Sequence, residues 1–211
     1  MFYVVARAIL RLVLGIAFNI KVEGKENVPP EGGVILAANH SSMLDPLLVG
    51  CAISRPIRFM AKRELFENPF LALIVPNLGA FPVKRGKNDK GAFHQALNIV
   101  KGDQVLGMFP EGTRSSDGRL QKAYSGVAVL AEKTGACVVP VGIVGVGRGI
   151  RKSTFPPKRR HIYISFGKPI VPSEVHSRIS ANQDSIGLKE AITGLMMDEI
   201  KKLVAGFRNI N

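Results

Sequence analysis

The sequence is poor in several residue types, and each shortage excludes a class of protein. Its 211 residues contain no tryptophan, two cysteines and 7% aromatic residues. The cysteines, Cys51 and Cys137, lie in separate apolar stretches and form neither a CxxC pair nor a disulfide framework. A small domain stapled by disulfides is therefore excluded, and a reducing compartment fits.

Acidic residues are also scarce, since 16 Asp and Glu stand against 29 Lys and Arg, giving a formal net charge of +13. Such a charge predicts an anionic partner: a nucleic acid, a membrane surface or a phosphorylated substrate. The 46% hydrophobic content excludes a disordered or collagen-like chain. The length suits one globular domain, which we assign to residues 21–211.

The first 20 residues are almost wholly apolar except for Arg7 and Arg11, whose spacing places both on one face of a helix. The arginines interrupt the apolar run rather than precede it, which argues against a secretory signal. The stretch is only marginally long enough to span a bilayer. We therefore predict an amphipathic helix over residues 1–20 in the membrane interface, with its arginines at the headgroups. The alternative is a core helix with snorkelling arginines.

Downstream, short apolar runs alternate with stretches of helical character. This alternation predicts an α/β fold, with a mostly parallel central sheet flanked by helices. The expected strands are 34–39, 57–60, 80–83, 105–109, 138–144 and 162–166, and the expected helices are 89–100, 126–133 and 187–207, with a further helix starting near Pro46. Residues 145–160 are glycine-rich and then basic, and we interpret them as a surface loop without phosphate-loop spacing.

The first strand ends in a polar motif that runs from Asn39 and His40 to Asp45 and Pro46. Five residues of helix rotate by about 500°, so His40 and Asp45 meet only if the backbone bends between them. Asp45 is also a candidate N-cap before Pro46. If its carboxylate accepts one imidazole N–H, the other ring nitrogen is free to act as a general base. No GxSxG motif supplies a serine nucleophile, so a substrate hydroxyl is the better candidate.

Two more strand ends carry polar residues. Residues 79–86 end with Lys84 and Arg85, and residues 109–116 read FPEGTRSS. In a parallel sheet these loops and the His40 loop emerge at the carboxyl edge, where ligands bind. Their cationic side chains suit a phosphate. No group of His, Cys, Asp and Glu has metal-ligand spacing.

These blocks together resemble those of the glycerolipid acyltransferase family. The family's Asn-His and later Asp are matched by Asn39, His40 and Asp45, and its Phe-Pro-Glu-Gly-Thr-Arg-Ser block is matched letter for letter by residues 109–115. Residues 79–86 resemble its basic block, and residues 138–142 its apolar run into Pro-Val.

The resemblance implies roles for these residues. His40 would deprotonate the free glycerol hydroxyl of a lysophospholipid, which attacks an acyl thioester, while Asp45 orients the imidazole. It implies no metal, no cofactor and no covalent acyl-enzyme; acyl-CoA or acyl carrier protein would be the donor substrate. The resemblance also implies a buried tunnel for the acyl chain, to which residues 69–83 would contribute. The expected substrate-binding residues are Lys84, Arg85 and Arg114 at the acceptor phosphate, and Glu111, Gly112 and Thr113 at the glycerol.

The expected activity is acylation of 1-acyl-glycerol 3-phosphate to phosphatidic acid in phospholipid biosynthesis. The expected location is the cytoplasmic side of the cell membrane, as a peripheral or monotopic protein on an anionic surface. One alternative is an acyltransferase for another lysophospholipid or for glycerol 3-phosphate, and another is a nonenzymatic basic protein that binds membrane or nucleic acid. RNA binders interleave stacking aromatics with basic residues, but residues 145–160 offer only Phe155, so we expect no nucleic-acid partner.

Overall fold

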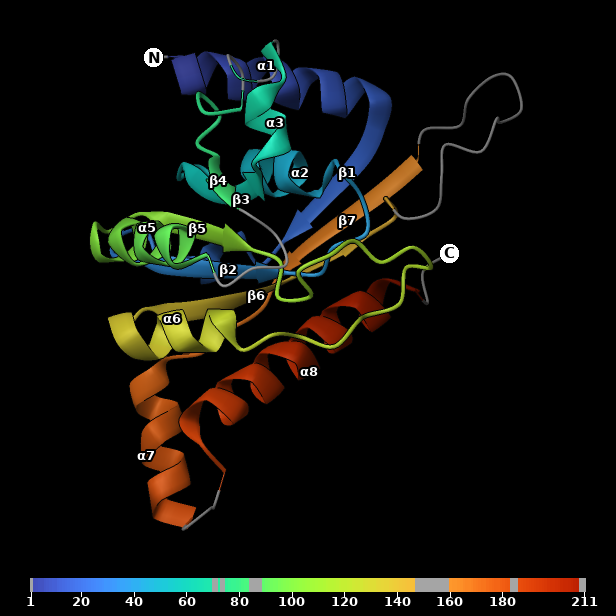
Figure 1. Cartoon of the computed structure of the whole chain (residues 1–211). Helices are drawn as coiled ribbons and strands as arrows, with labels where there is room; N and C mark the ends of the chain where they lie inside the picture. Colours follow the sequence, from blue (N-terminus) through green and yellow to red (C-terminus); the bar gives the residue numbers. More distant parts are fainter. Residues whose placement is uncertain are drawn as a thin grey trace.

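A twisted sheet forms the middle layer of the computed structural model, which describes residues 2–69, 72, 75–83, 89–146, 160–182 and 186–208 (Figure 1). Within those residues the sheet has seven strands in the order β1-β7-β6-β2-β5-β3-β4. Neighbouring strands are parallel except β6 and β7, which are antiparallel. The strands are β1 (Phe18–Glu23), β2 (Val34–Ala38), β3 (Ile57–Lys62), β4 (Phe81–Val83), β5 (Val105–Met108), β6 (Cys137–Val144) and β7 (Arg160–Phe166).

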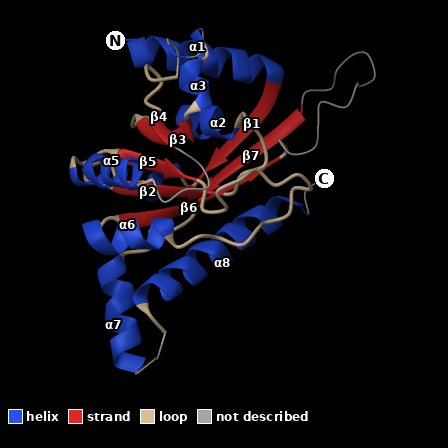
Figure 2. Cartoon of the chain, in the orientation of Figure 1, coloured by secondary structure: helices blue, strands red, loops and turns tan. Residues whose placement is uncertain are grey.

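Helices cover both faces of this sheet (Figure 2). Helices α1 (Phe2–Ala17), α2 (Asp45–Ala52) and α3 (Glu64–Glu67) lie on one side, and α6 (Gly126–Thr134) and α8 (Leu188–Arg208) lie on the other. The remaining elements are η1 (Lys25–Asn27), α5 (Lys90–Lys101) and α7 (Pro172–Asn182). The α/β fold class predicted from the sequence, with a mostly parallel sheet between helices, is confirmed.

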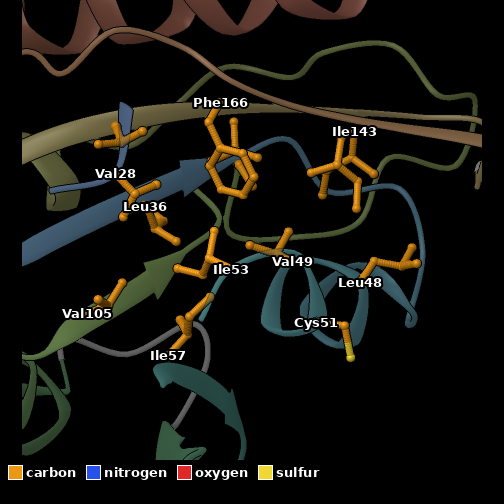
Figure 3. Packing of buried hydrophobic residues seen from close by; sticks show 14 of the residues in the cluster. Val28, Leu36, Leu48, Val49, Cys51, Ile53, Ile57, Val105, Ile143 and Phe166 are labelled. Atoms are coloured by element: carbon orange, nitrogen blue, oxygen red, sulfur yellow. The ribbon is translucent and has the colours of Figure 1, made fainter. Parts of the chain in front are cut away.

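Strand β2 explains why the molecule has two cores. All five of its residues are buried, and because side chains alternate along a strand they supply both faces. Leu36 and Ala38 join the cluster that packs α1 and α2, whereas Ile35 and Ala37 join the cluster that packs α5, α6 and α8. Figure 3 shows part of the first cluster, with Val49 of α2 directed toward the sheet.

The structure contains all six predicted strands, and its described part also has elements that the sequence patterns missed: the short η1 and α3, and two longer ones. One is α7, whose sequence has little apolar character. The other is β1, which pairs with β7 over its full length and contains the predicted boundary between residues 20 and 21. Its sequence FNIKVE alternates between half-buried and exposed residues, but it directly follows an apolar helix that hides this period.

Helix α1 packs against the domain with one face and exposes apolar residues on the other. Leu14 is buried, and the guanidinium of Arg7 donates hydrogen bonds to the carbonyls of Ile53 (3.0 Å) and Ser54. The prediction that the arginines lie at lipid headgroups is therefore wrong for Arg7, which binds backbone just beyond α2. The exposed apolar side chains of α1 are 51% to 65% accessible: Val4, Val5, Ile9, Leu12, Val13 and Ile16. No helix in the described part of the chain is long and apolar enough to cross a bilayer.

Candidate active site

The turn between β2 and α2 brings His40 and Asp45 together, as the bent-backbone prediction requires. His40 Nδ1 lies 2.8 Å from Asp45 Oδ2, and the two residues are 5% and 0% exposed. The same oxygen accepts the backbone N–H groups of Ser41 and Ser42, both at 2.7 Å. A carboxylate held this way accepts the Nδ1 proton and leaves the other ring nitrogen, Nε2, free to take a proton.

Asp45 does not cap α2, contrary to the N-cap prediction. The N-cap position is Leu44, and Asp45 is the first residue of the helix. Its carboxylate reaches back to the amides of the preceding turn instead of forward to the first helical turn. The turn is therefore shaped around the carboxylate that orients His40.

The loop after β5 encloses His40 from a second side. The Phe109 ring stacks on the imidazole, with centroids 4.0 Å apart and planes 17° apart. The backbone N–H of Ser115 donates to the His40 carbonyl at 2.8 Å. The backbone N–H of His40 in turn donates to Glu111 Oε1 at 3.2 Å. The FPEGTRS block thus fixes both the plane of the His40 imidazole and the backbone of His40.

Glu111 lies inside this loop rather than on its surface. It is 3% exposed, and its second oxygen accepts the N–H of Gln121 at 3.2 Å. Burial raises the pKa of its carboxyl, and the hydrogen bonds from His40 and Gln121 oppose that rise. Contact of Glu111 with a substrate glycerol stays a prediction, but the contacts that the structure records tie it to the backbone of His40.

Asn39 fixes the end of β2. Its side-chain amide donates to the Ile143 carbonyl at 2.9 Å, and its amide oxygen accepts the Ile143 N–H at 2.7 Å. The side chain thereby continues the β2–β6 ladder where the backbone turns away toward His40. The sequence motifs contain Asn39 and Phe109 but predict no role for either residue, although both directly follow a buried strand.

Gly112, Thr113 and Arg114 of the FPEGTRS block are exposed beside the His40–Asp45 dyad. Gly112 has φ +70°, and an added Cβ would lie 3.1 Å from the Tyr124 ring, so the turn favours glycine. Thr113 Oγ1 pairs with Gln121 at 3.2 Å. The Arg114 side chain makes no ion pair with any described residue, so its cation is available to an anion. Lys84 and Arg85 lie outside the described residues.

An apolar cavity of about 250 Å³ opens along α2 next to the dyad. Met43 and Pro46, which flank Asp45, line it together with Leu47 and Gly50 of α2. Its far walls come from α1, β3 and the segment before β4, through Tyr3, Leu10, Phe59, Met60, Val75 and Leu78. Phe59 also stacks with Phe109 at 6.0 Å, so an aromatic column joins the cavity wall to His40.

A buried His–Asp dyad at the carboxyl edge of an α/β sheet, with an apolar cavity and an exposed arginine beside it, suits acyl transfer to a substrate hydroxyl. The family model described as Acyltransferase matches residues 19–144, more than half of the chain. The chain belongs to this acyltransferase family, which confirms the resemblance found in its sequence.

Individual relatives agree with this assignment. The chain is 29% identical over 195 residues to the 1-acyl-sn-glycerol-3-phosphate acyltransferase of Bacillus subtilis, covering 92% of each chain. It is 28% identical over 203 residues to the enzyme of that name from Borreliella burgdorferi, covering 95% of this chain and 78% of that one. The crystal structure of the 1-acyl-sn-glycerophosphate acyltransferase PlsC from Thermotoga maritima matches the fold, with a TM-score of 0.75 at 23% identity over 96% of this chain and 78% of that one.

Proposed function

We propose that this enzyme transfers an acyl group from an acyl thioester to the free hydroxyl of 1-acyl-glycerol 3-phosphate, forming phosphatidic acid. The observation that carries the proposal is the 2.8 Å contact between His40 and Asp45, next to an apolar cavity lined by Met43 and Pro46. The names of the B. subtilis and B. burgdorferi relatives support this acceptor.

The dyad supplies the proton transfers of the reaction. Because Asp45 accepts the Nδ1 proton, Nε2 takes the proton of the acceptor hydroxyl while the oxygen attacks the thioester carbonyl. The C–O ester bond forms, the C–S bond breaks, and the imidazolium returns its proton to the leaving thiolate. The negative charge of Asp45 stabilises the imidazolium between these steps. This route needs no metal or cofactor, and free thiol leaves with each ester formed.

Two features of the site would bind the acceptor phosphate and the acyl chain. The exposed cation of Arg114 suits the acceptor phosphate, because guanidinium binds phosphate in a bidentate way; Lys84 and Arg85 are proposed to assist. The cavity along α2 suits an acyl chain. Gly50 lines the cavity, and an added Cβ there would meet nothing within 4 Å, so a larger residue at this position would take up cavity space.

The exposed apolar face of α1 suits a peripheral or monotopic position on an anionic membrane. Leu12 and Ile16 are 65% and 61% exposed and would insert into the interface, where burial of apolar surface drives binding. The double substitution Leu12→Ser and Ile16→Ser should reduce sedimentation with anionic vesicles. Ile186→Ser, at a site 56% exposed in the loop before α8, is the matched control. The cytoplasmic side and the choice between acyl-CoA and acyl carrier protein stay predictions.

The activity is tested by measuring thiol release from acyl-CoA and acyl carrier protein with a panel of acceptors. The proposal expects 1-acyl-glycerol 3-phosphate to exceed monoacylglycerol, glycerol 3-phosphate and other lysophospholipids in kcat/KM, with phosphatidic acid as the product. A higher kcat/KM for a different lysophospholipid would reassign the acceptor. Thiol release without ester formation would contradict acyl transfer.

A further inference from the structure

A second cavity lies on the other flank of α2, between α1, β1 and η1, with a volume of about 390 Å³. Its floor is apolar: Leu14, Leu48 and Cys51 are at most 9% exposed. Figure 3 shows Cys51 on the side of α2 opposite Val49, although both belong to the same buried cluster. Half-buried residues of β1 complete the wall: Phe18, Ile20 and Val22.

Two cations from different elements line this cavity. Arg11 comes from α1 and Lys25 from η1, and no Asp or Glu is among the lining residues. Unlike Arg7, neither side chain makes a hydrogen bond or ion pair with the residues that the structure describes. Burial raises the pKa of the Cys51 thiol, and the charges of Arg11 and Arg7 oppose this rise, so the charge of Arg11 acts at the cavity wall.

We propose that this cavity binds the phosphate headgroup of an anionic membrane phospholipid. An isolated pair of cations favours a phosphate, and the apolar floor favours the glycerol and first methylenes of a lipid over a free ion. Arg11 and Gly15, which line the cavity on α1, are exposed and each precedes an exposed apolar residue, Leu12 and Ile16, which would meet the acyl region of the same leaflet. The proposed membrane location of the enzyme supplies the lipid; binding itself does not depend on the reaction.

This site is distinct from the substrate site. It contains neither member of the dyad nor any residue of the FPEGTRS block, and the two cavities share only Cys51 as a lining residue. Helix α2 separates them, with Leu47 and Gly50 facing one cavity and Leu48 and Ala52 the other.

The cavity can be tested by charge and by volume independently. Arg11→Gln and Lys25→Gln each remove one cation. Gly15→Leu adds volume where an added Cβ would meet nothing within 4 Å, and it favours the helix because leucine is a better helix former than glycine. Gly50→Leu fills the other cavity, and Lys101→Gln removes an exposed cation of α5, so both serve as matched controls.

The experiment titrates the full chain calorimetrically with dihexanoyl phosphatidylglycerol below its micelle concentration. Arg11→Gln and Lys25→Gln should each weaken binding by about tenfold or more, and Gly15→Leu should abolish it. Gly50→Leu and Lys101→Gln should bind as the wild type does. Dihexanoyl phosphatidylcholine and inorganic phosphate should each bind at least about tenfold more weakly than phosphatidylglycerol.

Three results would overturn the proposal. Equal affinity for inorganic phosphate would show a site for free anions and not for a lipid. Unchanged binding in Arg11→Gln and Lys25→Gln would show that these two cations do not bind the headgroup. Loss of binding in Gly50→Leu alone would place the probe in the substrate cavity. Thiol release measured on the same preparations separates the two proposals, because failed turnover with intact lipid binding contradicts only the proposed activity.

Discussion

Replacing Glu111 by glutamine tests whether this residue holds the catalytic base or the substrate. The carboxylate accepts one N–H from His40 and one from Gln121, each at 3.2 Å. Glutamine has the same shape but only one acceptor oxygen, so one of these two N–H groups would face an NH₂ donor. The substitution therefore removes a charge-assisted hydrogen bond on the backbone of His40 or on the loop that encloses it.

The expected loss follows from geometry. A hydrogen bond to a charged group contributes about 1.5–3 kcal/mol, enough for the enclosing loop to relax. A shift of about 1 Å at a catalytic group can cost about 10² in rate. We expect kcat to fall by about 10- to 100-fold and the acceptor KM to stay within about twofold, because the interaction serves the transition state and not acceptor binding.

The assay is steady-state thiol release with the acceptor varied at saturating donor. Glu132→Gln is the matched control, since Glu132 forms a surface pair with Lys189 at 3.5 Å, away from the dyad. A raised acceptor KM with unchanged kcat would refute the positioning role and would put Glu111 at the glycerol, as the resemblance implies. Wild-type values for both constants would refute either role.

Further substitutions test the other parts of the site. His40→Ala should lower kcat by about 10² to 10⁴ with little change in melting temperature, and near-wild-type thiol release by the purified variant would eliminate the base. Arg114→Ala should raise the acceptor KM by about 10- to 150-fold and leave the donor KM unchanged; the opposite pattern would place this cation at the donor. Gly50→Leu should shift preference toward shorter chains in a competition among acyl donors, and an unchanged product distribution would place the chain elsewhere. Burial raises the pKa of Glu111 above its ordinary 4.5, so the folded state binds this proton more tightly than the unfolded state. Wild-type stability should therefore fall relative to Glu111→Gln as the pH rises above about 4.5, measured by urea unfolding, and parallel pH profiles would contradict this.

The sequence predicted those features that are encoded locally. Short apolar runs between glycine, proline or charged residues identified six strands, because buried parallel strands are apolar on both faces. The Asn-His and FPEGTRS blocks identified His40, Asp45 and Arg114. Their meeting at one sheet edge followed from the parallel topology, which requires each loop after a strand to emerge on the same side.

Contacts between distant segments could not be predicted in this way. The bond of Arg7 to the carbonyls of Ile53 and Ser54 spans more than 40 residues, and nothing in the apolar N-terminal stretch distinguishes Arg7 from Arg11. The pairing of Asn39 with Ile143 spans 104 residues. The burial of Glu111 under the His40 backbone likewise depends on how two loops fold together, whereas its place in a polar block predicts exposure.

Helix α2 connects these separate observations. Its first residue, Asp45, orients the base, and its two flanks line the substrate cavity and the proposed lipid cavity. Beyond its other end, the carbonyl of Ile53 is held by Arg7 of α1. Helix α2 is therefore anchored at both ends, by the turn amides that hold the Asp45 carboxylate and by the contact of Arg7 with the carbonyl of Ile53.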